Sequence, residues 1–192
     1  EMIEALSRAH HHLAQQLRPA AAQTPATPLH WHRPLSELLP PLMAAAQQRS
    51  LALAFTASAP RLHDEAARDN RAALLVLGLY VNRVSLATLV PAARDWPALP
   101  VRPVTLQGRE DWAQHYLTSA ALATDLGGRL SDLIGMYKEL LDASPQGRGS
   151  GFSFNDIAAD KAGVRLGRIA VQQPQALQAR MAEVQADTDL LP

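Results

Sequence analysis

Apolar side chains recur at intervals of three and four residues through most of the chain, and this spacing is typical of one face of an α-helix. Between residues 64 and 89 the pattern predicts one long helix, and positions 72–81 are apolar in nearly every place. We therefore expect this helix to lie at the centre, with other helices around it. Shorter helices are predicted over residues 1–18, 109–123, 129–143, 153–169 and 176–186.

Leucines at helical spacing also mark residues 34–50, but Pro40 and Pro41 interrupt them. A proline has no amide hydrogen and its ring collides with the preceding turn, so a helix interior rarely accepts two in a row. We expect a short helical turn before the two prolines. A new helix is expected to begin near Pro41, because a proline fits the first turn of a helix.

Proline-rich stretches at residues 19–28 and 91–103 predict irregular links between the helices. Residues 101–106 favour a short strand for which the sequence shows no partner, and the tail up to Pro192 is expected to fray. The whole pattern predicts an all-α protein, a single domain of about six or seven helices with long irregular links.

Length and composition agree with one domain. The chain has 192 residues and is 47% hydrophobic, which is enough for one sizeable core. We expect residues 1–28 to form an N-terminal helix and a linker, and residues 29–192 to form a single helical domain. The motifs with candidate chemistry gather in the part of this domain from residue 104 to residue 170.

Charge and cysteine content exclude several classes of protein. The formal net charge is zero, from 18 basic and 18 acidic residues, and no basic stripe with interleaved aromatic residues is present. We therefore expect no nucleic-acid partner. The chain has no cysteine, which excludes disulfides, thiolate metal sites and a cysteine nucleophile. The apolar runs are too short for a membrane span.

Three polar residues share one face of the helix predicted at 109–123. Asp111, His115 and Ser119 are each four positions apart, so they lie one above the other on a helix. An aspartate and a histidine at this spacing can hold a metal ion, or the carboxylate can orient the imidazole. The alternative is a structural Asp–His hydrogen bond near the start of a helix.

Two acids and two glycines share a narrow stripe of the helix predicted at 153–169. Asp156, Asp160, Gly163 and Gly167 follow one another at intervals of four, three and four. Glycines at this spacing permit two helices to approach closely, which would partly bury the acids. Buried carboxylates need a cation, hydrogen-bond donors or a metal, and we expect a histidine of the preceding motif to supply this partner. Alternatively, the first acid only caps its helix and the second pairs with a surface base.

Together these motifs resemble a known pattern. It is similar to the YfiM-type lipoproteins of bacterial envelopes and, more loosely, to VanZ-like membrane proteins, from which the chain departs by lacking membrane spans. The resemblance implies a bacterial envelope protein with a shared polar site, and a partner that is another envelope component or protein, but it implies no reaction. The matching residues are Asp111, His115, Tyr116 and Ser119, then Lys138, Glu139 and Asp142, then Gly149, Gly151, Phe152, Ser153, Asp156, Asp160, Gly163 and Gly167.

The start of the chain bears on its location. The sequence begins at Glu1 without an initiator methionine, and no signal peptide is visible there. We expect a mature form from which a signal peptide has been removed, and hence a periplasmic or secreted protein. A cytoplasmic location is the alternative.

Two functional hypotheses follow. In the first, the protein is a non-catalytic envelope protein whose Asp, His and Glu cluster is a polar network that fixes the register of the helices. In the alternative, it is a metal-dependent or acid/base hydrolase of an envelope substrate, with His115 and Glu139 as catalytic residues and Glu139 as general base on a bound water. The ligands of its divalent ion, zinc or manganese, would be Asp111, His115, Asp156 and Asp160.

Overall fold

The computed structural model describes residues 1–18, 32–124 and 154–191. Within these ranges the chain forms six α-helices and one small sheet, which confirms the predicted all-α class. The helices are α1 (Met2–Gln16), α2 (Leu35–Leu53), α3 (Ala59–Val81), α4 (Glu110–Ala123), α6 (Phe154–Gln172) and α7 (Pro174–Met181), with short 3-10 helices η2 (Leu86–Thr88), η3 (Pro91–Asp95) and η6 (Asp187–Leu190).

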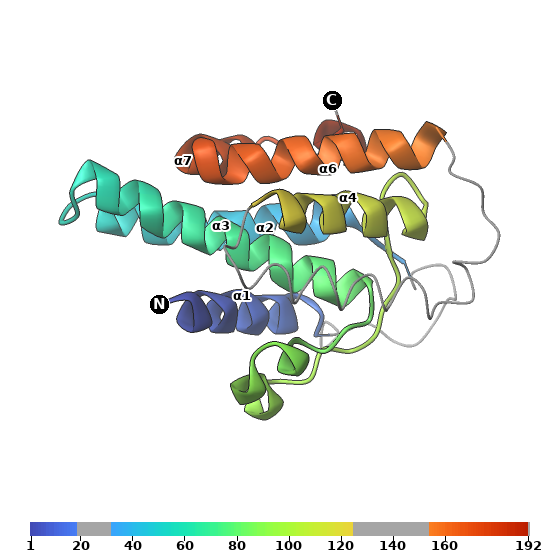
Figure 1. Ribbon diagram of the computed structural model, residues 1–192, viewed down its shortest axis with the longest axis horizontal. Coiled ribbons are helices and arrows are strands. Elements are labelled where there is room, and N and C mark those ends of the chain that lie inside the picture. The colour runs from blue at the N-terminus through green and yellow to red at the C-terminus, as the bar shows by residue number, and fades with distance from the viewer. Residues whose placement is uncertain (19–31, 125–153, 192) are drawn as a thin grey trace.

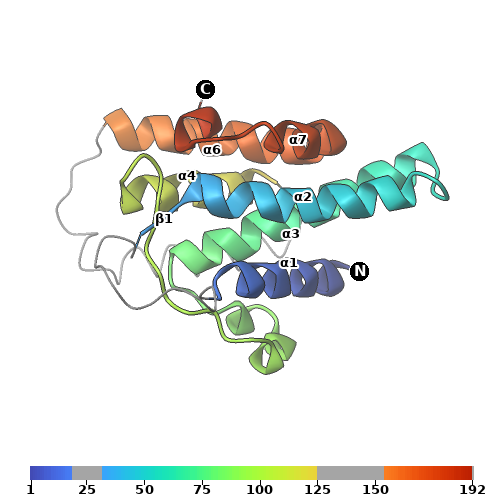
Figure 2. The same cartoon turned by 180° about the vertical axis from the view of Figure 1, so that it is seen from behind.

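The predicted central helix is confirmed as α3. In Figures 1 and 2, α1 lies on one side of α3, and α4 and α6 lie on the other. Every side chain from Ala72 to Leu77 is at most 7% exposed, so this part of α3 is buried on all faces. Apolar residues of α1, including Leu6 and Leu13, belong to the same core. The N-terminal helix is therefore part of the bundle.

The ends of α3 differ from the predicted ones at residues 64 and 89. The helix begins earlier because Pro60 fits its first turn, where the missing amide hydrogen has no intrahelical partner to lose. It ends at Val81 because the next residue, Asn82, turns its side-chain amide back to the Gly78 carbonyl at 2.7 Å. Arg83 then adopts a left-handed backbone conformation, with a φ of 60°.

The predicted break at Pro40 and Pro41 is wrong, because α2 continues through both prolines. Each interior proline costs about 3 kcal/mol relative to alanine. The burial of Leu38, Leu39 and Met43, all 0% exposed, contributes about 1.5–3 kcal/mol for each side chain. Tertiary packing of this face of α2 therefore offsets the local cost, which sequence propensity alone does not include.

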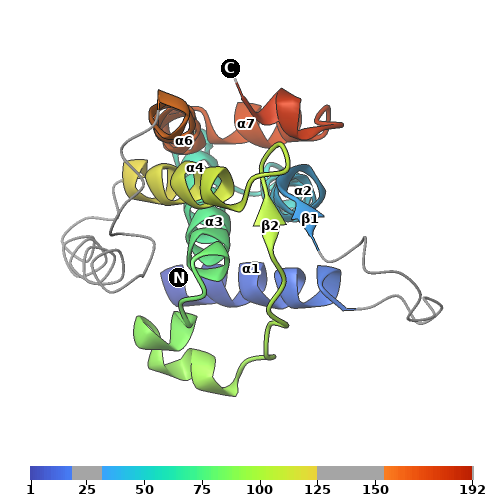
Figure 3. The ribbon, with the colours of Figure 1, turned by 90° about the vertical axis from the view of Figure 1, so that its right-hand side faces the viewer.

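The short strand predicted within residues 101–106 is confirmed as β2 (Val104–Thr105), and its partner is β1 (Arg33–Pro34). The two strands are parallel and lie side by side in Figure 3. The amide of Arg33 also donates to the Pro103 carbonyl at 2.9 Å. Two residues are too few to show an alternating pattern, so β1 could not be predicted from the sequence.

The tail that was expected to fray is packed up to Leu191, and α7 ends five residues before the predicted end at 186. The buried hydroxyl of Tyr116 donates to the Leu190 carbonyl at 2.9 Å. The carboxylate of Asp187 accepts the amide of Ser36 at 2.9 Å and the amide of Gln107 at 2.7 Å. These long-range bonds hold η6 against α2 and α4.

Candidate functional site

The helices α4 and α6 run side by side in the same direction (Figure 1), and glycines set their close contact. A Cβ atom added at Gly163 would overlap the carbonyl oxygen of Tyr116. One turn further, a Cβ at Gly167 would overlap the carbonyl oxygen of Ala120. Both pairs are four residues apart, so one turn of α6 lies on one turn of α4. The predicted role of these glycines in close helix packing is confirmed.

The close contact brings three predicted polar residues together. The Nδ1 atom of His115 lies 3.2 Å from Oδ1 of Asp160, and the hydroxyl of Ser119 donates to the same oxygen at 2.7 Å. The histidine and the serine are on α4 and the aspartate is on α6. We call His115, Ser119 and Asp160 the α4–α6 cluster.

The hydrogen bonds of the α4–α6 cluster limit its chemistry. A bond to the carboxylate needs a hydrogen on Nδ1 of His115, which leaves Nε2 to accept or carry a second proton. Ser119 bonds to the carboxylate and not to the imidazole. The three residues therefore do not form the Ser–His–Asp arrangement of hydrolases, in which the imidazole takes the serine proton. The side chains of His115 and Asp160 are 34% and 33% exposed, so water reaches both.

Asp111 lies in the first turn of α4, where an acid is favoured by the positive end of the helix dipole. Both of its carboxylate oxygens accept hydrogen bonds from the Arg109 guanidinium. These bonds hold the pKa of Asp111 below its usual value, and Asp111 in turn raises the pKa of Arg109, with a smaller contribution from Asp156. The structure thus pairs Asp111 with Arg109, whereas the helical spacing predicted a pair with His115.

The four predicted metal ligands, Asp111, His115, Asp156 and Asp160, all lie within the described residues. Asp156 is partly buried in the first turn of α6, and Glu139, the predicted general base, lies outside the described residues. Within residues 1–18, 32–124 and 154–191, no three histidine, cysteine or acidic side chains converge as the ligands of one metal ion would. Zinc or manganese binding stays a prediction.

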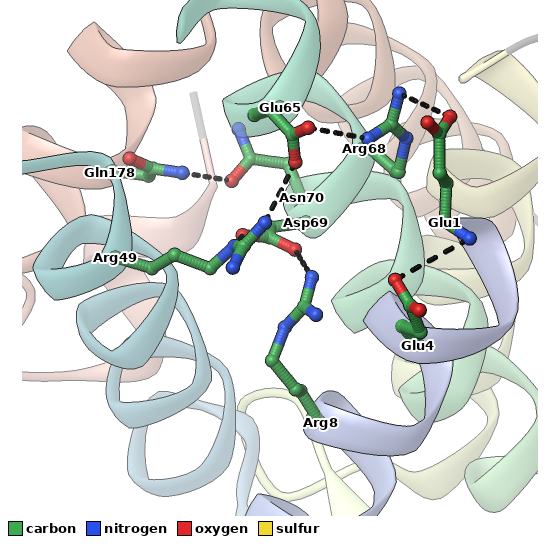
Figure 4. Close-up of polar contacts among 9 residues, drawn as sticks. All are labelled: Glu1, Glu4, Arg8, Arg49, Glu65, Arg68, Asp69, Asn70 and Gln178. Atoms are coloured by element: carbon green, nitrogen blue, oxygen red, sulfur yellow. Dashed lines mark hydrogen bonds and ion pairs between the residues drawn. The ribbon is translucent and has the colours of Figure 1, made fainter. Parts of the chain in front are cut away.

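A second polar group, which was not predicted from the sequence, surrounds Asp69 of α3 (Figure 4). The Asp69 side chain is only 7% exposed. Arg8 of α1 donates from Nη2 to its Oδ1 at 2.6 Å, and Nε of Arg49 in α2 lies 3.0 Å from its Oδ2. A buried carboxylate is costly unless it is paired. One carboxylate therefore joins three helices through two guanidinium groups.

The ion pairs continue along α3. Arg49 also donates from Nη2 to Glu65 at 2.8 Å, and Nη1 of Arg68 lies 3.0 Å from the other oxygen of Glu65. The hydrogen bond from Arg49 is the main reason that the pKa of Glu65 lies below its usual value, and it outweighs the opposing effect of desolvation. We call Arg8, Arg49, Glu65, Arg68 and Asp69 the Asp69 network.

Asn70, next to Asp69, extends the polar contacts towards the C-terminal helices. It is fully buried, and its Nδ2 donates to the carbonyls of Ala170 at 3.0 Å and Pro174 at 3.1 Å. Its Oδ1 accepts a hydrogen bond from Gln178 at 2.9 Å. Both donors and the acceptor of the amide are thereby used, and α3 is tied to the junction of α6 and α7.

The sequence carried one signal of this second group. Asp69 and Asn70 stand just before apolar positions 72–81, in the helix that was expected to be central. Polar groups next to a helical stretch that is buried on all faces need partners. The partners of Asp69 come from positions 8 and 49 and those of Asn70 from positions 170, 174 and 178, and no spacing rule connects segments so far apart.

No helix of the described ranges combines the length and the apolar run that a membrane crossing requires. Comparisons of the chain with protein-family models, with curated proteins and with solved structures found no match. The resemblance to YfiM-type lipoproteins, which rests on the motif residues alone, stays a prediction.

Proposed function

We propose that the protein is a non-catalytic helical protein of the bacterial envelope, and that the α4–α6 cluster fixes the register between two helices. The envelope location rests on the motif resemblance. The structural role rests on one observation: His115 and Ser119 of α4 bond to the same oxygen of Asp160, one turn from the glycine contact of Gly163 with Tyr116.

The geometry supports a register role in two ways. The backbones touch at the two glycines, so sliding α6 by one residue would drive side chains into the α4 carbonyls. The same slide would take Asp160 away from Ser119 and His115 and leave a partly buried carboxylate with fewer donors. Steric contact and hydrogen bonding therefore select the same register.

Stability measurements on Asp160→Ala test this role. We expect a loss of about 1–2 kcal/mol in the free energy of unfolding by urea, because two hydrogen bonds to a charged group are lost. Asp95→Ala is the matched control, because Asp95 is exposed and lies far from α6 in η3. An Asp160→Ala protein as stable as wild type would contradict the proposal.

The catalytic alternative has one supporting observation. The bond between Nδ1 of His115 and Asp160 orients the imidazole, and Nε2 makes no hydrogen bond within the described residues. An imidazole held in this way can act as a general acid or base. Elemental analysis of dialysed protein, with His115→Ala as control, separates the hypotheses. Near-stoichiometric zinc or manganese that the control loses would favour the hydrolase, and metal-free protein with a destabilised control would favour the register role.

A further inference from the structure

A cleft of about 320 Å³ lies between α1 and α2, with α3 at its base, and it has no part in the proposed function. This volume is in the range of small-molecule sites. Much of its wall is alanine, and larger side chains at these positions would fill the space. The apolar residues that line it are Ala5, Ala9, Leu42, Ala45, Ala46 and Ala73.

The polar end of this cleft is formed by part of the Asp69 network. Arg8, Arg49 and Asp69 all line it. The arginine side chains are 40% and 35% exposed, whereas the aspartate is 7% exposed. Arg8 donates from Nη2 to Asp69, and Arg49 donates from Nη2 to Glu65 while its Nε faces Asp69 at 3.0 Å. A guanidinium has five N–H donors, so both keep donors for a ligand.

Asp69 serves as a positioning residue for these donors. Its two oxygens engage one arginine each, so the guanidiniums of Arg8 and Arg49 are held near one another although they come from different helices (Figure 4). Long, flexible arginine side chains lose conformational entropy when they bind a ligand. The ion pairs with Asp69 have already fixed much of their freedom, which favours binding of a further anion.

We propose that this cleft binds a small organic monocarboxylate, with the carboxylate on Arg8 and Arg49 and the apolar body against the alanine wall. Arginine donors match the planar geometry of a carboxylate. The two arginines and Asp69 give the lining a formal charge of about +1. This charge balances a monoanion, whereas a phosphate dianion would meet the Asp69 carboxylate with too little positive charge.

Calorimetric titration of the whole chain at pH 7 and constant ionic strength tests this proposal. The probes are butyrate, hexanoate and benzoate, with benzamide as the neutral analogue of benzoate and inorganic phosphate as the dianion. We expect saturable binding of at least one carboxylate, and binding of benzamide and phosphate at least tenfold weaker. No saturable carboxylate binding, or phosphate bound more tightly than any carboxylate, would overturn the proposal.

Two variants locate the binding. Arg8→Gln keeps a donor for Asp69 but removes the charge, and Ala45→Leu fills the cleft while all three charged residues remain. Each is expected to weaken carboxylate binding at least tenfold. Arg61→Gln, on an exposed turn of α3, is the control and should bind as wild type does. Circular dichroism verifies that each variant folds, and one folded variant is enough for the test. A folded variant that binds the carboxylate with wild-type affinity would overturn the assignment to this cleft.

Discussion

The α4–α6 cluster and the Asp69 network hold helices together by different means. The cluster leaves Asp160 33% exposed, bonds it to a serine and a histidine, and sits beside a glycine contact of two backbones. The network buries Asp69 to 7% exposure and pairs it with two full charges from two other helices. The cluster therefore depends mainly on close packing with modest hydrogen bonding, whereas the network depends on charge neutralisation.

This difference determines how much each region contributes to the stability of the fold. A carboxylate that is one-third exposed keeps water as an alternative partner, so its bonds are worth little more than ordinary hydrogen bonds. A buried carboxylate has no such alternative, so the loss of either side of its ion pairs leaves an uncompensated charge. The Asp69 network, which was not predicted from the sequence, should therefore contribute more to stability than the α4–α6 cluster, which was predicted in part.

The largest effect is expected from Asp69→Asn. This change removes the carboxylate between Arg8 and Arg49, so Arg8 loses its ion-pair partner and Arg49 keeps only Glu65, and we expect a loss of about 3 kcal/mol in the free energy of unfolding. Urea denaturation at pH 7 measures it. Glu37→Gln is the matched control, because Glu37 pairs with Arg33 but is 53% exposed, and it should cost less than about 1 kcal/mol. Equal losses in the free energy of unfolding for the two variants would contradict the expected difference between a buried and an exposed ion pair.

The next effect concerns packing in the α4–α6 contact. Gly163→Ala places a methyl group on the Tyr116 carbonyl, so the helices must move apart, at a cost of about 2 kcal/mol. Gly78→Ala is the control, because its Cβ would lie 3.4 Å from the Leu117 carbonyl oxygen, at ordinary contact distance. The control should be near neutral, since alanine favours helix. If Gly163→Ala left the melting temperature unchanged, the contact between α4 and α6 would tolerate a larger separation of the helices.

A smaller effect is expected from Glu65→Gln, with a loss of about 1 kcal/mol at pH 7. The pKa of Glu65 is lowered in the folded protein, mainly by its hydrogen bond from Arg49. Its ionised form therefore stabilises the fold above the ordinary value of 4.5, and this contribution is lost as the pH falls below that value. Urea denaturation from pH 7 to pH 3 should show a shallower acid loss in the variant. An unchanged pH profile would exclude Glu65 as a source of acid sensitivity.

The smallest effect is expected from Asp111→Asn. Asp111 is 46% exposed and pairs with a neighbour in sequence, Arg109, so its loss should change the free energy of unfolding by less than about 0.5 kcal/mol. High salt should reduce even this difference. A loss above 1 kcal/mol in urea denaturation would mean that Asp111 has a structural or ligand role beyond its pairing with Arg109.

Spacing along one helix was enough to predict the α4–α6 cluster in part. His115 and Asp160 were paired correctly, and Gly163 was placed correctly at a close helix contact, because residues four apart share a face whatever surrounds them. The same rule misplaced Asp111, since it says nothing about a stronger partner two residues away in Arg109.

The remaining differences have physical causes outside local pattern. The helix through Pro40 and Pro41 is held by burial of leucines against other helices, which a local propensity rule does not count. The tail is held by Asp187, whose partners are backbone amides of distant segments. The Asp69 network needs side chains from three helices, so it exists only in the folded protein.

The central claim is that the α4–α6 cluster fixes helix register, and a double-mutant cycle on Ser119 and Asp160 tests it most directly. The free energies of unfolding of wild type, Ser119→Ala, Asp160→Ala and the double variant give the coupling between the two residues. We expect a favourable coupling of about 1 kcal/mol, as for a hydrogen bond to a charged group. Additive effects within about 0.3 kcal/mol would contradict the account, because the hydrogen bond between Ser119 and Asp160 would then contribute nothing to the packing of α6 on α4.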